Sequence, residues 1–210
     1  MEAALYLIPV TLGDTSVDQV LPSYNREVVV AIRHFIVENV RSARRFLRQV
    51  DRTFPIDEST FYEMGKHADE RLFSQYLQPL RDGLPVGVIS EAGCPAVADP
   101  GAVVVGIAHR QGLRVVPLVG PSSMIMAVMS SGLNGQSFAF SGYLPVDDAE
   151  RARRLKELET RAWNEHQTQL CIETPYRNRK LFDTILHTLR PQTRLCVAAG
   201  ITTMVVFRDL

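Results

Sequence analysis

The stretch best suited to bind a ligand is a loop of small side chains at residues 89–101, which reads ISEAGCPAVADPG. It lies between apolar runs at 84–89 and 103–108, so it is predicted to join a strand to a helix, which is where open α/β sheets bind ligands. Small side chains let a ligand approach the main chain, and Gly93 can adopt a positive φ without steric cost. The last three residues predict a helix start capped by Asp99. A plain capped turn would explain those three alone, whereas the whole stretch favours a ligand loop.

A second candidate is a basic stretch at helical spacing. Residues 41–52 predict an amphipathic helix that begins at Asn39 or Ser42 and ends near Pro55. Its apolar residues fall on one side, and the other side carries Arg41, Arg44, Arg45, Arg48 and Arg52. A guanidinium group binds a phosphate through two parallel hydrogen bonds, which an ammonium group cannot do. The pattern is compatible with a phosphate or RNA contact and equally with an ordinary solvated helix face.

Alternating strands and helices must position these residues. The apolar runs predict strands at 3–8, 34–37, 60–64, 84–90, 113–119, 137–141, 169–173 and 194–198. Helices are predicted at 41–52, 70–80, 101–111, 124–129, 148–162 and 176–189, while 24–32 has mixed periodicity. This alternation predicts an α/β fold with a mainly parallel sheet and helices on its faces. The alternation of predicted strands and helices is interrupted at Gly120-Pro121. We therefore expect one α/β domain over 1–117 and another over 118–210.

Composition limits the functions to be considered. The chain has 210 residues, 46% of them hydrophobic and 22% charged, as in a folded soluble protein. Its formal net charge is zero, so any contact with nucleic acid must come from local patches. Three widely spaced cysteines form no disulfide framework and five histidines show no zinc-binding spacing, so we expect no metal and a reducing cytoplasm. We also expect neither a membrane span nor secretion, because no apolar run is long enough and residues 1–10 lack a basic leader.

The glycine pattern argues against the commonest nucleotide sites. None of the 13 glycines forms GxGxxG or GxxxxGKS/T, so neither a dinucleotide Rossmann site nor a P-loop is expected. The nucleophile motif GxSxG is missing, and no serine, histidine and aspartate set indicates a catalytic triad.

Six sequence blocks together match a known family. In order they read LYLIPVTLGD at 5–14, VENVRSARRFL at 37–47, ISEAGCPAVADPG at 89–101, VVPLVGPSSMIMAVMSSGL at 115–133, FSGYLP at 140–145 and IETPYRN at 172–178. In these blocks, which are spread over nearly the whole chain, the sequence resembles the tetrapyrrole-methylase-like (class III) S-adenosylmethionine methyltransferases. Within that superfamily it looks most like the branch that methylates a ribose 2′-hydroxyl of small-subunit ribosomal RNA.

The resemblance implies two α/β domains, a cleft between them that holds S-adenosylmethionine, and a homodimer. The cofactor-contacting positions that it implies, block by block, are Pro9, Gly13, Asp14, Glu91, Ala92, Gly93, Ser122, Ser123 and Glu173. The first three would line the floor of the cleft, and the backbone at 91–93 would meet the methionine end of the cofactor. Such a zwitterionic ligand needs hydrogen-bond donors and acceptors, which side-chain-poor loops present. Taken alone, Pro9 could simply end a strand and Ser122 could only cap a helix.

The sequence departs from the RNA-methylating branch at several places. Where that branch tends to read AEDTR, this chain has VENVR at 37–41, so Asn39 replaces an expected carboxylate. Where the branch tends to read RELTK, this chain has AGITT at 199–203, which loses an arginine and a glutamate. The 210 residues also stop before the closing strands that the family carries. Cofactor binding is expected to survive these changes better than substrate choice.

For methyl transfer to a ribose, Glu38 and Arg41 are the catalytic candidates. A ribose hydroxyl is a poor nucleophile unless a base takes its proton or its oxyanion is stabilised. Glu38 or Glu173 could be that base, and Arg41 could hold a phosphate or polarise the hydroxyl. Both carboxylates could instead pair with arginines of the 41–52 helix. Further cations that could extend a phosphate-binding rim are Arg151, Arg153, Arg154, Arg177, Arg179 and Lys180.

Three functions remain open. The first is methylation of ribosomal RNA, with the small ribosomal subunit as partner, which the arginine helix and the loop sequences favour. The second is methylation of a tetrapyrrole carbon, which predicts a deep apolar trough and no salt-sensitive RNA binding. The third is a non-catalytic cofactor-binding relative that lost activity with Asn39, Gly200 and the short C-terminus.

Overall fold

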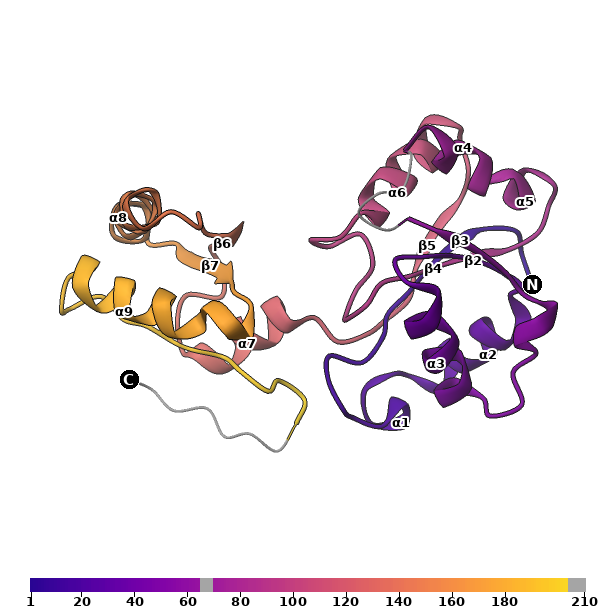
Figure 1. Cartoon of the computed structure of the whole chain (residues 1–210), viewed down its shortest axis with the longest axis horizontal. Helices are drawn as coiled ribbons and strands as arrows, with labels where there is room; N and C mark the ends of the chain where they lie inside the picture. Colours follow the sequence, from indigo (N-terminus) through magenta and orange to yellow (C-terminus); the bar gives the residue numbers. More distant parts are fainter. Residues whose placement is uncertain (65–69, 204–210) are drawn as a thin grey trace. The chain divides into compact units, whose positions relative to one another are not determined.

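The computed structural model describes residues 1–64 and 70–203 as two compact units (Figure 1). The first unit comprises Met1–Ser123 and a return segment that begins at Gly200, and the second comprises Met124–Ala199. The sequence-based boundary at 117/118 lies before the Gly-Pro break, but the break itself belongs to the first unit. Asn25 Nδ2 donates to the Val119 carbonyl at 2.8 Å, which holds that segment there. The last residues of the predicted second domain, 204–210, lie outside the described residues.

The first unit is built on a parallel sheet. Its strands are β1 (Leu5–Ile8), β2 (His34–Val37), β3 (Thr60–Glu63), β4 (Val86–Ile89) and β5 (Val115–Pro117), in the spatial order β3-β2-β4-β1-β5. Every pairing between these five strands is parallel, so the carboxyl ends meet at one edge of the sheet. The predicted α/β fold with a mainly parallel sheet is therefore confirmed.

Helices cover both faces of this sheet (Figure 1). On one face lie α1 (Val17–Val20), α2 (Ser23–Ala31) and α3 (Val40–Val50), and on the other lie α4 (Phe73–Tyr76), α5 (Gln78–Arg81) and α6 (Gly101–Arg110). The 3-10 helices η1 (Ile56–Glu58) and η2 (Glu70–Leu72) complete the connections. Two buried apolar clusters result, one with Phe46 and Leu47 of α3 and one with Val104 of α6. Burial of these side chains from water is the main force that holds the layers together.

Neighbouring strands β4 and β1 form a topological switch point. From β1 the chain passes through α2 to β2 on one face, whereas from β4 it passes through α6 to β5 on the other. The loops that follow β1 and β4 therefore separate at the carboxyl edge, which is the place where open α/β sheets bind ligands.

The second unit contains a shorter parallel pair. Strands β6 (Phe138–Tyr143) and β7 (Thr168–Ile172) are joined by the long helix α8 (Asp148–Glu165). The remaining elements are α7 (Ser123–Ser131), η3 (Pro175–Arg177) and α9 (Asn178–Thr188). Leucines of α8, α9 and the β6–α8 loop pack together in its core, namely Leu144, Leu155, Leu158 and Leu181.

Three predicted elements differ from the structure. The segment 24–32 is helix α2, whose mixed pattern arises because Asn25 is buried beside apolar side chains. The helix predicted at 70–80 is broken into η2, α4 and α5, and Pro79 lies in the first turn of α5. The strand predicted at 194–198 is wrong, because within the described residues that segment forms no ladder with β6 or β7.

Candidate functional site

The loops after β1 and β4 meet at the switch point through their main chains. The Val10 N–H donates to the Gly93 carbonyl at 2.9 Å and forms an isolated bridge. Gly93 has φ +69°, the positive value that the sequence predicted. A Cβ atom on Gly93 would lie 3.0 Å from Leu12 Cδ2 and 3.4 Å from the Pro121 carbonyl oxygen. Glycine is therefore required by both its backbone conformation and the space available.

A third segment, residues 118–121 after β5, contacts the loops that follow β1 and β4. A Cβ atom on Gly120 would lie 2.1 Å from Pro9 Cβ, so the two main chains pack against each other. The Cys94 thiol lies 3.4 Å from the Pro121 carbonyl, and Asn25 fixes the same segment. The three loops thus lie in contact at Pro9, Gly93 and residues 118–121. Ser122 and Ser123 follow directly in the chain.

Sequence reasoning did not select Asn25 or Cys94. Asn25 is 3% exposed and lies in α2, where a buried amide among apolar positions was the available signal. Cys94 lies in the predicted ligand loop, but a lone cysteine has no motif that indicates a packing role. Burial raises the pKa of its thiol, which is consistent with packing against Pro121 rather than with nucleophilic chemistry.

Asp99 holds the ligand loop in an uncommon backbone conformation. Its Oδ1 accepts hydrogen bonds from the Ala96 N–H at 2.8 Å and the Gly101 N–H at 2.7 Å. Gly101 begins α6, and the N-cap residue of that helix is Pro100, with no side-chain cap; the predicted capping by Asp99 is therefore wrong, because Asp99 lies one residue too early and binds the Gly101 N–H from there. Ala96 and Ala98 have φ values of 66° and 61°, a region that alanine rarely adopts. Strain of this kind persists only where the surroundings enforce it and is concentrated at functional sites.

Glu38, which follows β2, reaches the same loop. Its Oε1 accepts a hydrogen bond from the Glu91 N–H at 3.0 Å. Burial is the largest effect and raises the pKa of Glu38; the charges of Asp99 and Glu91 raise it further, while the Glu91 N–H acts in the opposite direction. The alternative that Glu38 pairs with an arginine of α3 is not observed among the described residues.

Two neighbours of Glu38 occupy the start of α3. Asn39 Oδ1 accepts from the Ser42 N–H at 3.0 Å and caps the helix, so the amide retains the capping function that a carboxylate would have. Arg41 lies in the first turn and is exposed. Within the described chain it forms no ion pair or side-chain hydrogen bond, so its guanidinium group is available to a ligand.

Gly13 and Asp14 lie in the exposed turn after β1. A Cβ atom on Gly13 would lie 3.5 Å from Thr203 Cγ2, and Thr15 Oγ1 lies 3.2 Å from Thr202 Oγ1. The 200–203 segment, which departs from the RNA-methylating pattern, therefore returns to the first unit beside this turn.

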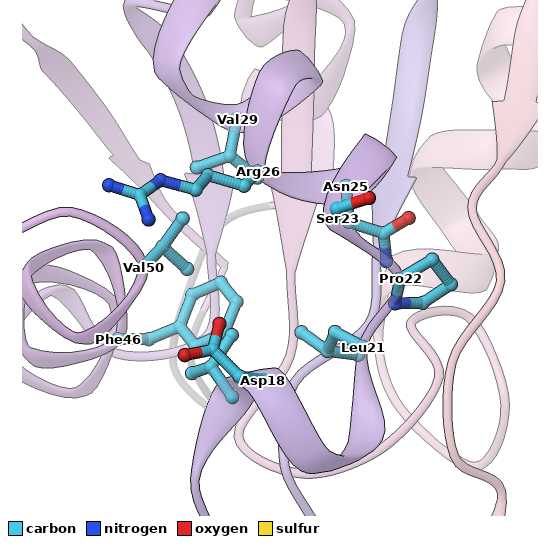
Figure 2. A pocket seen from close by; sticks show the side chains of 10 residues that line it. Asp18, Leu21, Pro22, Ser23, Asn25, Arg26, Val29, Phe46 and Val50 are labelled. Carbon is cyan, nitrogen blue, oxygen red and sulfur yellow. The ribbon is translucent and has the colours of Figure 1, made fainter.

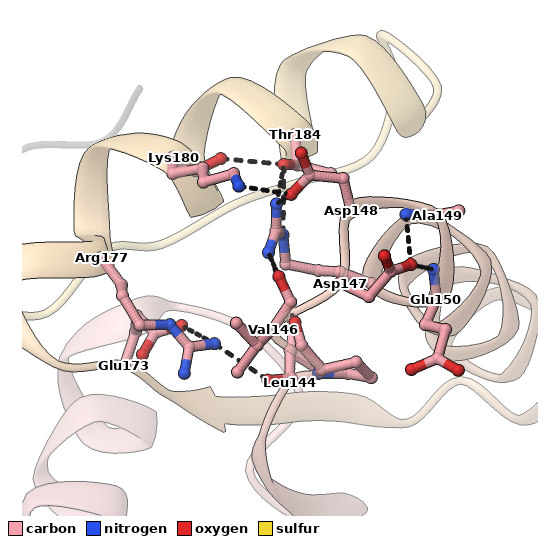
Figure 3. A network of polar contacts seen from close by, with 12 residues as sticks. Leu144, Val146, Asp147, Asp148, Ala149, Glu150, Glu173, Arg177, Lys180 and Thr184 are labelled. Atoms are coloured by element: carbon pink, nitrogen blue, oxygen red, sulfur yellow. Dashed lines mark hydrogen bonds and ion pairs between the residues drawn. The ribbon is translucent and has the colours of Figure 1, made fainter.

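Glu173 lies after β7 in the second unit, where its carboxylate already has partners (Figure 3). Its Oε2 lies 2.9 Å from Arg177 Nη2, and its Oε1 accepts from the Thr174 N–H at 2.8 Å. Arg177 also donates to the Leu144 carbonyl at 3.1 Å. This group ties β7 to the β6–α8 loop, and the predicted alternative of pairing with α3 arginines is not the arrangement found.

Arg151 was expected in an exposed phosphate-binding rim, and this prediction is wrong. Arg151 is 2% exposed, and its guanidinium group donates to Thr184 Oγ1 and to the carbonyls of Pro145 and Val146. It also pairs with Asp148. All of these contacts lie inside the second unit, so Arg151 is a structural residue. The other rim candidates on α8 and α9 that are exposed are Arg153, Arg179 and Lys180, and Lys180 Nζ lies 2.8 Å from Asp148 Oδ1.

A pocket of about 220 Å³ lies among α1, α2 and α3 (Figure 2). Its apolar lining includes Leu21, Val29 and Phe46, and Asp18 and Arg26 are its charged residues. None of the predicted cofactor-contacting residues lines it. Asn25, which also lines the pocket, donates to the Val119 carbonyl, so the pocket adjoins the 118–121 segment without including the predicted residues.

Several other features bear on the class of protein. In residues 1–64 and 70–203, no group of three or more histidine, cysteine, aspartate or glutamate side chains is arranged to hold a metal ion. Cys94, Cys171 and Cys196 are not joined in disulfides. None of the helices in the described part of the chain has the length and apolar character needed to cross a membrane.

Comparisons with known proteins agree with this geometry. No protein-family model matches the chain. The chain is 27% identical over 198 residues to the ribosomal RNA small subunit methyltransferase I of Vibrio cholerae, which covers 94% of the chain and 65% of that protein. It is 31% identical over 202 residues to the protein of the same name from Mesorhizobium japonicum, with 96% and 65% covered. The chain thus spans about two thirds of the length of these relatives.

A solved structure shows the same fold. The crystal structure of the methyltransferase CobJ matches 99% of this chain and 86% of its own chain, with a TM-score of 0.64 and 14% sequence identity. The resemblance drawn from the six sequence blocks is therefore confirmed: the chain is similar over most of its length to the ribosomal RNA small subunit methyltransferases I, and it has the fold of the methyltransferase CobJ.

Proposed function

We propose that the chain carries the catalytic part of an S-adenosylmethionine-dependent methyltransferase that modifies a ribose 2′-hydroxyl of small-subunit ribosomal RNA. The observation that supports the cofactor site most directly is the main-chain meeting of Pro9, Gly93 and the 118–121 segment. The relatives of this chain are named as ribosomal RNA small subunit methyltransferases, which supports the substrate. The proposal includes a homodimer and action in the cytoplasm.

The residues present fit such a cofactor. Gly93 has no side chain, so a ligand at this loop would meet main-chain atoms. Exposed Glu91 offers a carboxylate to an ammonium group. The residues that would hold the cofactor in this unit are Pro9, Gly13, Asp14, Glu91, Ala92, Gly93, Ser122 and Ser123. The bound cofactor would supply an electrophilic methyl group on a sulfonium centre.

Glu38 is the better candidate for the general base. Its raised pKa brings the carboxylate closer to the neutral range in which a base accepts a proton efficiently. Glu173, by contrast, is engaged by Arg177 and by the Thr174 N–H. Arg41 lies in the first turn of α3, three residues after Glu38, and would hold a phosphate of the substrate so that the hydroxyl is positioned.

The two other functions have less support. A tetrapyrrole substrate is suggested only by a fold likeness at 14% identity, and fold alone does not determine the reaction. A non-catalytic role was suggested partly by Asn39, yet this residue caps α3 in a normal way. We therefore favour RNA methylation.

A methyl-transfer assay tests the proposal. Small ribosomal subunits that lack this modification are incubated with the chain and a cofactor labelled on the methyl group, in parallel with tetrapyrrole precursors. We expect label in the RNA at an internucleotide bond that resists alkali, because a 2′-O-methyl group blocks cleavage there. The variant Glu38→Ala should lose turnover far more than cofactor affinity.

Other outcomes separate the alternatives. Label in the tetrapyrrole alone would contradict the RNA substrate. Cofactor binding without transfer to either substrate would favour the non-catalytic relative, and equal loss of turnover and affinity in the Glu38 variant would remove Glu38 from the chemistry.

A further inference from the structure

Helix α3 carries an arginine face that the cofactor site does not use. We define it as Arg41, Arg44, Arg45 and Arg48 of α3 together with Arg52, which follows the end of the helix; all five are exposed. Ala43, Phe46, Leu47 and Val50 on the opposite side of α3 are buried against the sheet. Arg41, Arg45 and Arg48 are spaced by four and three residues, so they lie along one side of the helix.

The arginine face has one acidic neighbour, because the charge of Arg48 contributes to lowering the pKa of Asp51, and Arg48 also donates to the Arg52 carbonyl. Among the described residues none of its five members forms an ion pair with a carboxylate, and α3 itself contains no acidic residue. Asp51 at the end of the helix binds the Thr53 N–H and hydroxyl and lies 3.8 Å from Arg26. Arg44 lies over the ring of Phe61 at 5.4 Å, which leaves its charge uncompensated.

Helix α8 shows the ordinary arrangement for surface arginines. Arg154 lies 3.0 Å from Glu157, and Arg161 lies 3.3 Å from Glu165, one helical turn away in each case. Arg153 also lies 3.9 Å from Glu157. The exposed charges of α8 are therefore balanced by neighbouring carboxylates, whereas the exposed side of α3 is strongly positive.

The charge on α3 opposes the stability of the helix. Like charges three or four residues apart repel each other, and Arg41 lies near the positive end of the helix dipole. The exposed side of α3 also has no apolar side chain that a protein partner would bury, since its remaining exposed position is Gln49. Guanidinium groups without apolar neighbours suit a phosphate backbone.

The position of α3 relates this face to the proposed site. The helix begins two residues after Glu38, whose carboxylate binds the Glu91 N–H of the ligand loop. We infer that the arginine face of α3 binds the phosphate backbone of the substrate RNA and leads it toward Glu38. This inference rests on the proposed function, because it assumes that the substrate is RNA.

Salt-dependent RNA binding tests the inference. Binding of the whole chain to a fluorescently labelled single-stranded RNA is measured by anisotropy over a range of salt concentrations. Each phosphate contact on a single strand contributes about 0.7 to the slope of log affinity against log salt. Arg45→Gln, Arg48→Gln and Arg52→Gln combined should therefore lower the slope by about 2 and weaken binding at low salt.

Two matched variants control the measurement. The combination Arg110→Gln, Arg114→Gln and Arg161→Gln removes the same charge at exposed arginines outside both the arginine face and the rim candidates, and it should leave the slope unchanged. The combination Arg45→Lys, Arg48→Lys and Arg52→Lys keeps the charge and should keep the slope while lowering affinity. If the triple glutamine variant fails to fold, Arg45→Gln and Arg48→Gln are measured singly, each with an expected loss of about 0.7.

The outcomes distinguish this inference from the proposed function. RNA binding by the unaltered chain that all α3 variants retain would overturn the inference and leave the proposed function standing. Calorimetric binding of S-adenosylmethionine with no RNA binding at any salt concentration would contradict the RNA substrate itself. Binding to polyglutamate as tight as to RNA would point instead to an acidic protein partner and overturn the inference.

Discussion

At the residue scale, the site depends on a few atoms that join separate loops. The Glu38 carboxylate accepts the Glu91 N–H, and the Asp99 carboxylate accepts the N–H groups of Ala96 and Gly101. Burial raises the pKa of both carboxyl groups. Each carboxylate therefore holds the ligand loop although its burial disfavours the charged form. Carboxyl groups with pKa values shifted in this way are common at functional sites.

Glu38→Gln tests the link between this site and pH. A carboxyl group whose pKa is raised in the folded state binds its proton more tightly than in the unfolded chain, so its protonation stabilises the folded state. As the pH falls from neutral through the raised pKa, the free energy of unfolding of the unaltered chain should increase relative to that of Glu38→Gln. Chemical denaturation followed by circular dichroism at several pH values measures this difference.

The same variant has a kinetic consequence. Methyl transfer by the unaltered chain should fall as the pH is lowered through the pKa of Glu38, because the base becomes protonated. The residual activity of Glu38→Gln should lack this acid limb.

For the denaturation measurement, a stability difference between the two proteins that does not change with pH would show that the environment of Glu38 is not the one described here.

At the element scale, α8 shows what sequence periodicity can and cannot predict. The residue pattern predicts its helical span and its exposed arginines. The same pattern predicts that Arg151 is a surface cation, which it is not. Its burial depends on Thr184 of α9 and on the carbonyls of Pro145 and Val146, which come close only after the unit has folded. Asn25 in α2 is a parallel case, because its carbonyl partner at Val119 lies far along the chain.

Arg151→Lys should destabilise the second unit by about 1–3 kcal/mol, because a single ammonium group cannot replace a fork that reaches several buried acceptors. Arg153→Lys on the same helix is the matched control and should change stability by less than about 0.5 kcal/mol, because Arg153 is exposed. Trp163 is the only tryptophan and lies on α8, so its fluorescence during denaturation reports this unit. Equal effects of the two variants would contradict the structural role of Arg151.

At the scale of the whole molecule, the parallel α/β class could be predicted because alternating strands and helices allow few other arrangements. The ligand loops could be predicted because the carboxyl ends of parallel strands share an edge. The strand order could not, since nothing in the apolar runs indicates that β4 enters between β2 and β1. The first compact unit extends to Ser123, past the Gly-Pro break. Asn25 and Pro9 contact residues 118–121 and hold them against this unit.

The central claim is that side-chain-poor loops at this edge bind S-adenosylmethionine through main-chain atoms. Gly93→Ala would place a Cβ atom 3.0 Å from Leu12 and 3.4 Å from the Pro121 carbonyl at a positive φ. Gly112→Ala is the matched control, because Gly112 has φ +67° with nothing within 4 Å of its Cβ position. Isothermal titration calorimetry with S-adenosylmethionine should show binding to the unaltered chain and to Gly112→Ala, and an affinity for Gly93→Ala lower by at least about tenfold, or about 1.4 kcal/mol. No heat with the unaltered chain, or equal affinities for all three proteins, would contradict the claim.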